Sequence, residues 1–127
     1  CHPGVGIEVL NALAAANDII IPIKADKNAL DGMEELDDVI TEIRPYNEKL
    51  NGVRCLVTMY TRDIDVIKGE EALRNSKYDV FNTHIRYSKK VTAWTYEAGK
   101  SLLETTPRSA ATRDYKDFVL EYMAKWV

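Results

Sequence analysis

The stretch from residue 11 to residue 32, NALAAANDIIIPIKADKNALDG, decides the fold of this chain. It reads as the end of an Ala-rich helix, a strand over residues 19–23, and the start of a second helix. The run Ile-Ile-Ile-Pro-Ile is too β-branched and too continuous for anything but a buried strand. Asp26 or Asn28 can cap the helix that follows it. The stretch therefore predicts a helix–strand–helix unit built around a buried strand.

The rest of the chain continues this alternation. A second strand is expected over residues 53–60 and a weaker third one over residues 80–85, with helical apolar patterns between the strands. Pro45 should end the second helix, and Ser109 should cap a final amphipathic helix. No two runs are joined by a hairpin signal. We therefore predict an α/β protein with a mostly parallel sheet.

Composition is typical of a soluble globular protein. The 127 residues are 46% hydrophobic and 29% charged, and no apolar run approaches the roughly 18 residues that span a bilayer. Two Cys residues make no disulfide framework, so a reducing cytosol is expected. The Cys and His residues lack metal-ligand spacing, so we expect no structural metal. The net charge is −3, which argues against a general polyanion binder, although basic residues gather in the last third.

Several segments occur in an order that resembles one known family. They are Cys1-His2-Pro3-Gly4, the Ile-Pro strand end, Ala29-Leu-Asp-Gly32, Leu56-Val-Thr-Met-Tyr60, Ile85-Arg86, Gly99-Lys-Ser-Leu102 and Pro107-Arg-Ser109. Together they resemble ParA-type partition ATPases, which belong to the ParA/MinD group of deviant P-loop proteins. The resemblance covers essentially the whole chain, and it rests on order and spacing because no single segment is diagnostic.

The resemblance implies that residues 1–127 are the C-terminal half of a ParA-like ATPase domain, with a three-layer P-loop NTPase fold. In that family a G-x-x-x-x-G-K-[ST] loop wraps the phosphates, and an Asp at a strand end holds the magnesium shell. This sequence contains no such loop, because its six Gly residues are scattered, and the Asp of that strand end is absent as well. We therefore expect ATP and Mg²⁺ to serve the intact protein, and we expect no catalytic residue and no ATP hydrolysis in this chain alone.

Two regions are implied to meet the nucleotide. Cys1, His2, Pro3 and Gly4 stand where the family has its γ-phosphate-sensing switch turn, although a plain strand-to-helix turn is the alternative. Base contacts are implied for residues at the carboxyl ends of two parallel strands, the edge at which open α/β sheets bind ligands. These nucleotide-binding candidates are Met59, Tyr60 and Arg86. Met59 as a core residue is an equal alternative, and the loop after Ile85 departs from the family's Ile-Pro-Arg-Asn.

Further roles are implied for charged residues. Asp26 and Lys27 would lie at the dimer interface, where a simple helix cap is the alternative for Asp26. A second set would contact DNA phosphates without reading sequence. Its members are Arg86, Lys89, Lys90, Lys100 and Arg108. A solvated charged face is the alternative interpretation of that set.

The resemblance implies a function in plasmid or chromosome partition. The intact protein would form an ATP-dependent homodimer, bind DNA non-specifically and meet a centromere-binding ParB-like partner, in the cytoplasm at the nucleoid. One alternative is a MinD-like membrane-positioning ATPase. The final helix argues against membrane binding, because its basic residues are balanced by acidic ones. The other alternative is a non-catalytic remnant that acts through dimerisation or binding.

Overall fold

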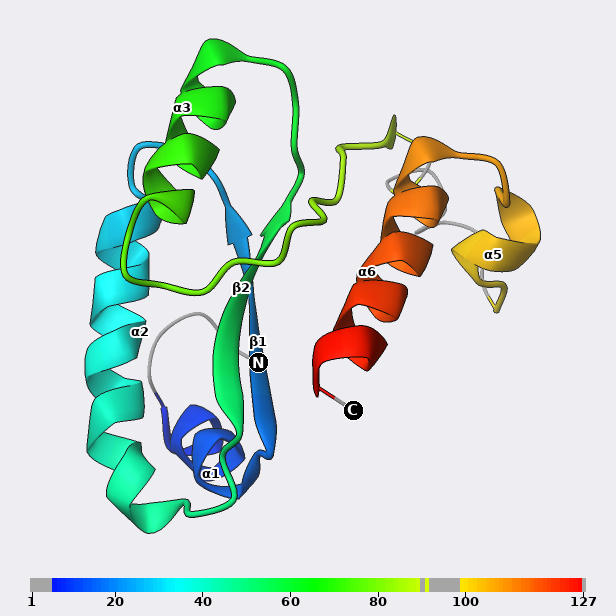
Figure 1. Cartoon of the computed structure of the whole chain (residues 1–127). Helices are drawn as coiled ribbons and strands as arrows, with labels where there is room; N and C mark the ends of the chain where they lie inside the picture. The colour runs from blue at the N-terminus through cyan, green and yellow to red at the C-terminus, as the bar shows by residue number, and fades with distance from the viewer. Residues whose placement is uncertain (1–5, 90, 92–98, 127) are drawn as a thin grey trace.

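The computed structural model describes residues 6–89, 91 and 99–126 (Figure 1). The predicted switch turn at residues 1–4 and Lys90 lie outside this part. In chain order the elements are α1 (Ile7–Ala15), β1 (Asp18–Lys24), α2 (Ala29–Ile43), the 3₁₀ turn η1 (Arg44–Tyr46), β2 (Gly52–Thr58), α3 (Ile64–Arg74), α5 (Leu102–Thr105) and α6 (Ala110–Trp126). The predicted helices and both predicted main strands are therefore present, with ends displaced by a few residues.

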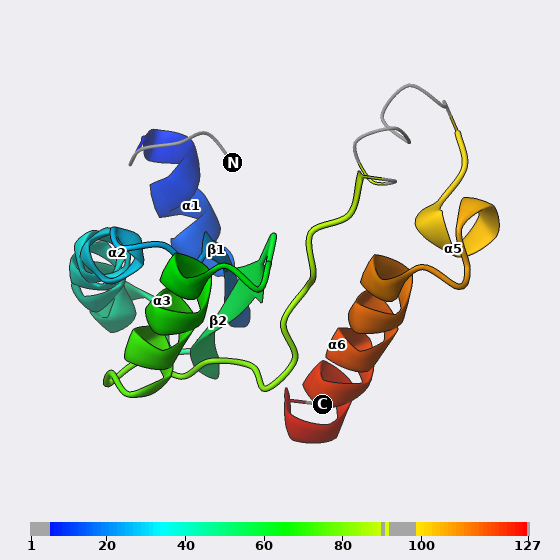
Figure 2. The same cartoon turned by 90° about the horizontal axis from the view of Figure 1, so that it is seen from above.

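The two strands lie side by side and run parallel. Their register pairs Asp18 with Gly52 at one end and Lys24 with Thr58 at the other. Figure 2 shows α1, α2 and α3 on one side of the strands and α5 and α6 on the other. The described residues thus confirm the α/β class and the parallel sheet. They form a sheet of two strands, so the full three-layer P-loop fold stays a prediction.

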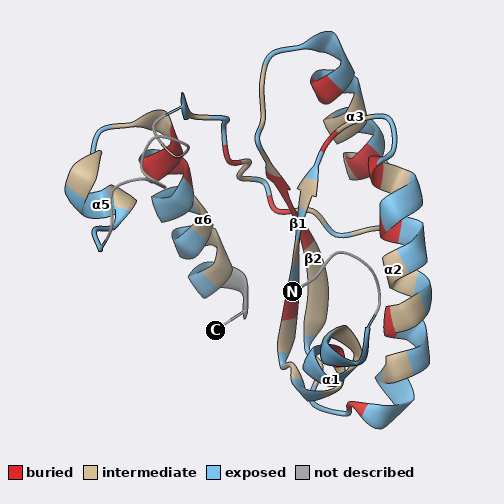
Figure 3. Ribbon diagram, turned by 180° about the vertical axis from the view of Figure 1, so that it is seen from behind, coloured by how far each residue is buried: buried red, intermediate tan, exposed pale blue. Residues whose placement is uncertain are grey.

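Alternation along the strands builds the core. Ile19, Ile21 and Ile23 of β1 pack against the side of α1 and α2, whereas the intervening side chains of β1 are exposed. Figure 3 shows the buried positions along the strands and on the helix faces turned toward them. At the centre of β2 the Cys55 sulfur lies 3.3 Å from the Met33 sulfur. Burial, and secondarily the charge of Asp79, raises the pKa of the Cys55 thiol to about 11.

Packing on the other face of the sheet depends on α6. Phe118 meets Phe81 edge to face, with ring centroids 4.9 Å apart, and packs against the cluster that Phe81 forms with Leu56 of β2 and Ile85. The Tyr122 hydroxyl donates to Asp18 at the start of β1 across 2.7 Å. As predicted, Ser109 caps this helix, because its hydroxyl oxygen accepts the Thr112 N–H. The amphipathic pattern of the final helix corresponds only in part to its packing on the sheet, because Phe118 and Tyr122 pack there whereas Val119 and Met123 are exposed.

The third predicted strand, over residues 80–85, is wrong as a continuous strand. The segment does run parallel to β2, with isolated bridges from Val80 to Cys55 and from Arg86 to Tyr60. Between these bridges the N–H groups of Asn82 and Thr83 turn away from β2 and donate to Glu121 of α6. Because a strand needs an unbroken ladder, the pairing is lost in the middle and survives at both ends.

β1 is paired with β2 on one side, and among the described residues no strand pairs with its other edge. Unpaired apolar edges are templates for association. We therefore expect the 127-residue chain to self-associate through β1 at tens of micromolar in sedimentation experiments. Ile20→Lys, at a position 36% exposed, should weaken that association. Ile64→Lys, at the start of α3 and 63% exposed, is the matched control. A monomer with protected β1 amides would contradict this expectation.

Candidate functional site at the carboxyl edge of the sheet

The chain turns sharply where β2 ends. Met59 has a φ of +53°, an uncommon conformation for a residue with a side chain, and is 49% exposed. Directly after Met59 the main chain pairs with the segment around Arg86. The Tyr60 N–H donates to Ile85 O across 2.9 Å, and the Tyr87 N–H donates to Tyr60 O across 2.8 Å. The Met59 turn is therefore held beside the segment that carries Arg86. Its exposure favours the ligand-contact interpretation of Met59 over the core interpretation.

A pocket of about 150 Å³ lies at this turn. Its walls come from the end of β2, from the segment after Ile85 and from α6; the lining residues are Thr58, Met59, Ile85, Arg86, Tyr87, Ser88, Val91 and Tyr115. Whole small-molecule ligands usually occupy about 300–1,000 Å³. The pocket therefore suits one ring-sized part of a larger ligand. It also stands at the carboxyl edge of a parallel sheet, where open α/β folds bind ligands.

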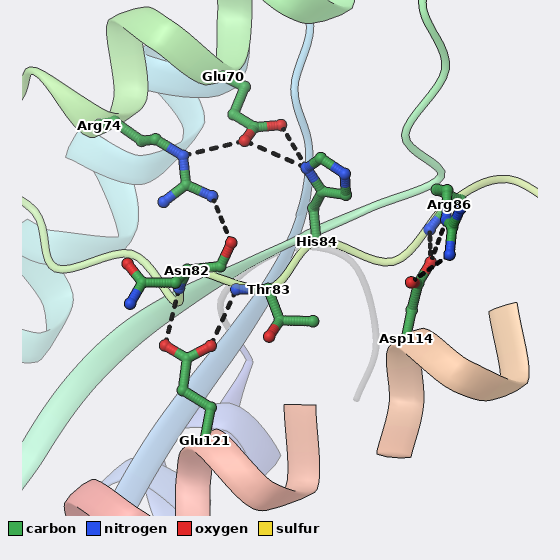
Figure 4. A network of polar contacts seen from close by, with 8 residues as sticks. All are labelled: Glu70, Arg74, Asn82, Thr83, His84, Arg86, Asp114 and Glu121. Carbon is green, nitrogen blue, oxygen red and sulfur yellow. Dashed lines mark hydrogen bonds and ion pairs between the residues drawn. The ribbon is translucent and has the colours of Figure 1, made fainter. Parts of the chain in front are cut away.

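Arg86 is held at the pocket by Asp114 of α6 (Figure 4). Its Nε and Nη2 atoms donate to the two carboxylate oxygens of Asp114 across 2.9 and 2.8 Å, and its main-chain N–H donates across 2.9 Å. Asp114 is buried, and burial alone would raise the pKa of its carboxyl. The hydrogen bonds and charge of Arg86 together outweigh burial and hold that pKa below its ordinary value.

A second set of contacts ties the same segment to α3 (Figure 4). The Nδ1 atom of His84 lies 3.1 and 3.2 Å from the two carboxylate oxygens of Glu70. Arg74 donates to Glu70 from Nε across 2.9 Å and to the Asn82 carbonyl from Nη2 across 3.2 Å. The Tyr60 ring stacks on His84 with centroids 3.8 Å apart. His84 is thus a partnered side chain that stacks on Tyr60.

The other candidate residues are not brought into this pocket. Asp26 accepts the Asn28 N–H at its side chain across 2.9 Å, so it forms the turn that precedes α2, and Lys27 is exposed. Both follow β1 at the same edge of the sheet as Met59. The DNA-contact candidates Lys89, Lys100 and Arg108 are exposed, and Arg86 is in its ion pair.

Sequence reasoning missed the acidic partners. Asp114, Glu121 and Glu70 hold the segment that forms the pocket wall, yet none was singled out. One signal was available, because Asp114 and Glu121 lie seven residues apart and flank Phe118 on one helix face.

Within the part of the chain that the structure describes, no cluster of three or more His, Cys, Asp or Glu could hold a metal ion. There too, no helix combines the length and apolar character needed to cross a bilayer.

The described residues form an α/β fold with a pocket at the carboxyl edge of its sheet. No protein-family model matches the chain. It is 30% identical to the chromosome-partitioning ATPase Soj of Thermus thermophilus over 97% of this chain and 50% of that protein. It is 27% identical to the sporulation initiation inhibitor protein Soj of Bacillus subtilis over 98% of this chain and 50% of that protein. A chromosome-partitioning ATPase Soj of Treponema pallidum is 30% identical over 98% of this chain.

These matches confirm the resemblance seen in the sequence. The chain is similar to ParA/Soj proteins along nearly its whole length, and it spans about half the length of the curated relatives it matches.

We expect Asp114→Asn to destabilise the fold at neutral pH and much less at acid pH. The folded-state pKa of Asp114 is depressed, so its ion pair stabilises the fold above the ordinary value of about 3.9 and stops doing so as pH falls through the folded-state pKa. Losing charged hydrogen bonds costs about 1–3 kcal/mol, nearer the low end here because Arg86 is 44% exposed.

Urea unfolding at several pH values checks this expectation. Asp117→Asn, at an exposed position of the same helix, is the control and should change stability little at any pH. A loss for Asp114→Asn that stays constant from pH 7 to below pH 4 would argue against the ion pair as its cause.

Proposed function

We propose that this chain is the C-terminal portion of a ParA-like partition ATPase and that its pocket receives the base end of ATP. The main support for this proposal is the pocket itself, which brings Met59 and Arg86 together at the carboxyl edge of the sheet. Support also comes from relatives named as chromosome-partitioning ATPases, which align along nearly the whole chain.

The contribution of this chain to nucleotide binding would be shape and orientation. A planar base inserted at the pocket meets the exposed thioether of Met59 on one wall and the ring of Tyr115 on another. Arg86 is held by Asp114 beside it, so the main chain of residues 85–88 is ordered before ligand arrives. The phosphates and Mg²⁺ are assigned to a G-x-x-x-x-G-K-[ST] loop, which this sequence does not contain.

Dimerisation, DNA binding and a ParB-like partner complete the proposal. ATP-dependent pairing of two copies would use the rim that carries Asp26 and Lys27. Non-specific DNA binding would use cations that follow the pocket segment. Lys89, Lys100 and Arg108 are exposed, and Lys90 lies outside the described residues. Exposed cations suit this role because phosphate contacts require charge and no reading helix.

Met59→Ala in the intact protein tests the pocket. We expect ATP to bind about five-fold more weakly, a loss of roughly 1 kcal/mol, because about half of a Met side chain's contact area would be removed from the base. Fluorescence titration with a labelled ATP analogue measures the effect. Met123→Ala is the matched control, because Met123 is exposed to a similar degree, 51%, and lies on α6 away from the pocket lining. Equal affinities for the two variants would remove Met59 from the site.

Charge reversal tests the DNA surface. In the intact protein with ATP, Lys89→Glu combined with Arg108→Glu should weaken binding to random-sequence duplex DNA. Each lost phosphate contact should reduce the slope of log affinity against log salt by about 0.9. Lys68→Glu, an exposed position on α3, is the control. An unchanged salt slope would mean that these residues form only a solvated surface.

A further inference from the structure

Two carboxylates of α6 hold the main chain that leads into the pocket. Glu121 accepts the N–H of Asn82 at Oε2 across 2.7 Å and the N–H of Thr83 at Oε1 across 2.8 Å. Asp114 accepts the N–H of Arg86 at Oδ2 across 2.9 Å. Three main-chain donors of one five-residue segment, 82–86, are therefore bound by side chains of a single helix (Figure 4).

The two carboxylates hold the segment near its two ends. Glu121 lies seven positions after Asp114, which is about two helical turns or roughly 10.5 Å of rise. The segment itself is not a regular extended strand, because Phe81 N–H donates to Cys55 O and Ile85 N–H to Val57 O, so that four residues of the segment lie beside two of β2. The helix runs opposite to the segment, because its first carboxylate binds the last donor. One rigid helix thus acts as a template for the position of the segment.

The same helix also forms part of the pocket wall. Tyr115 follows Asp114 directly and lines the pocket together with Arg86. Between the two carboxylates, Phe118 packs on Phe81 and on the cluster that contains Ile85. Any shift of α6 therefore moves a pocket wall and the main chain of residues 82–86 together, because hydrogen bonds join them at both ends and ring packing joins them in the middle.

Glu121 accepts a main-chain donor that could otherwise pair with β2. Alternate N–H groups of a strand point to opposite sides, so after the Phe81 N–H, which donates to Cys55 O, the Thr83 N–H is the next one that could continue the ladder, whereas the Asn82 N–H would point away from β2. By accepting the Thr83 N–H, Glu121 competes with that continuation, and the ladder resumes at Ile85, whose N–H donates to Val57 O across 2.8 Å. The length of this interruption sets where Ile85 and Arg86 stand beside Met59.

We propose that Glu121 and Asp114 are positioning residues for nucleotide binding, which hold the 82–86 segment at the spacing that the pocket requires. The proposal rests on the proposed function for its ligand. It assigns to Glu121, which does not line the pocket, an effect on nucleotide affinity that passes through the main chain of Asn82 and Thr83.

Glu121→Gln and Glu121→Ala in the intact protein test this role. Gln keeps one carbonyl oxygen and places an NH2 group where Glu has its second acceptor oxygen, whereas Ala accepts no N–H. We therefore expect amide exchange at residues 82 and 83, measured by mass spectrometry, to rise in the order wild type, Gln variant, Ala variant. The KM for ATP should rise in the same order, about three-fold and then about ten-fold, with kcat at saturating ATP unchanged. Asp117→Asn on the same helix should leave both measurements at wild-type values.

The outcomes separate this proposal from the proposed function. If the wild type binds ATP and the Glu121 variants speed amide exchange without raising the KM, then Glu121 is only structural and the positioning role is overturned. Unchanged amide exchange at residues 82 and 83 in the Ala variant overturns it as well. If the wild type binds no ATP by titration, the proposed function fails, and the positioning of a nucleotide site fails with it. Parallel increases in exchange and KM support the proposal.

Discussion

The parallel pairing of β1 with β2 is the constraint on which the rest of the structure depends. Its register brings the ends of both strands to one edge, where Lys24 pairs with Thr58 and the candidate site begins one residue later. Parallel strands need cover on both faces, because their apolar side chains point both ways. One face receives α1, α2 and α3, and the other receives α6, the helix that also shapes the pocket.

Much of the fold could be predicted from the sequence because its signals are local. The Ile-Ile-Ile-Pro-Ile run correctly predicts a strand, but the strand is packed on one face only, because Ile20 and Pro22 are exposed. The apolar spacing through Leu30, Met33 and Ile40 defines α2 on its own. The carboxyl-edge site followed from the parallel arrangement together with the resemblance to ParA-type proteins. Of the three residues chosen on that basis, Met59 and Arg86 line one pocket, whereas Tyr60 does not and stacks on His84 instead. Each of these inferences needed only neighbouring residues or the order of the elements.

The remaining features depend on contacts between distant parts of the chain. Residues 80–85 have a strand-like pattern, but Glu121 binds two of their main-chain donors from 38 or more positions away, and no local pattern encodes that competition. Arg86 looked like a free cation in the sequence, whereas Asp114 neutralises it across 28 positions. Acidic residues on an amphipathic helix usually face water, so their role as main-chain acceptors becomes visible only once the helix is docked.

The buried thiol of Cys55 makes β2 observable in solution. Its raised pKa keeps it protonated at neutral pH, and its burial against Met33 shields it from reagents. Thiolate is the reactive form, so modification requires the strand to separate from its neighbours first. The labelling rate of the Cys55 peptide therefore reports the free energy of local opening at the centre of the sheet. The native Cys55 side chain thus serves as a probe of the local stability of the sheet, and no residue has to be introduced for the measurement.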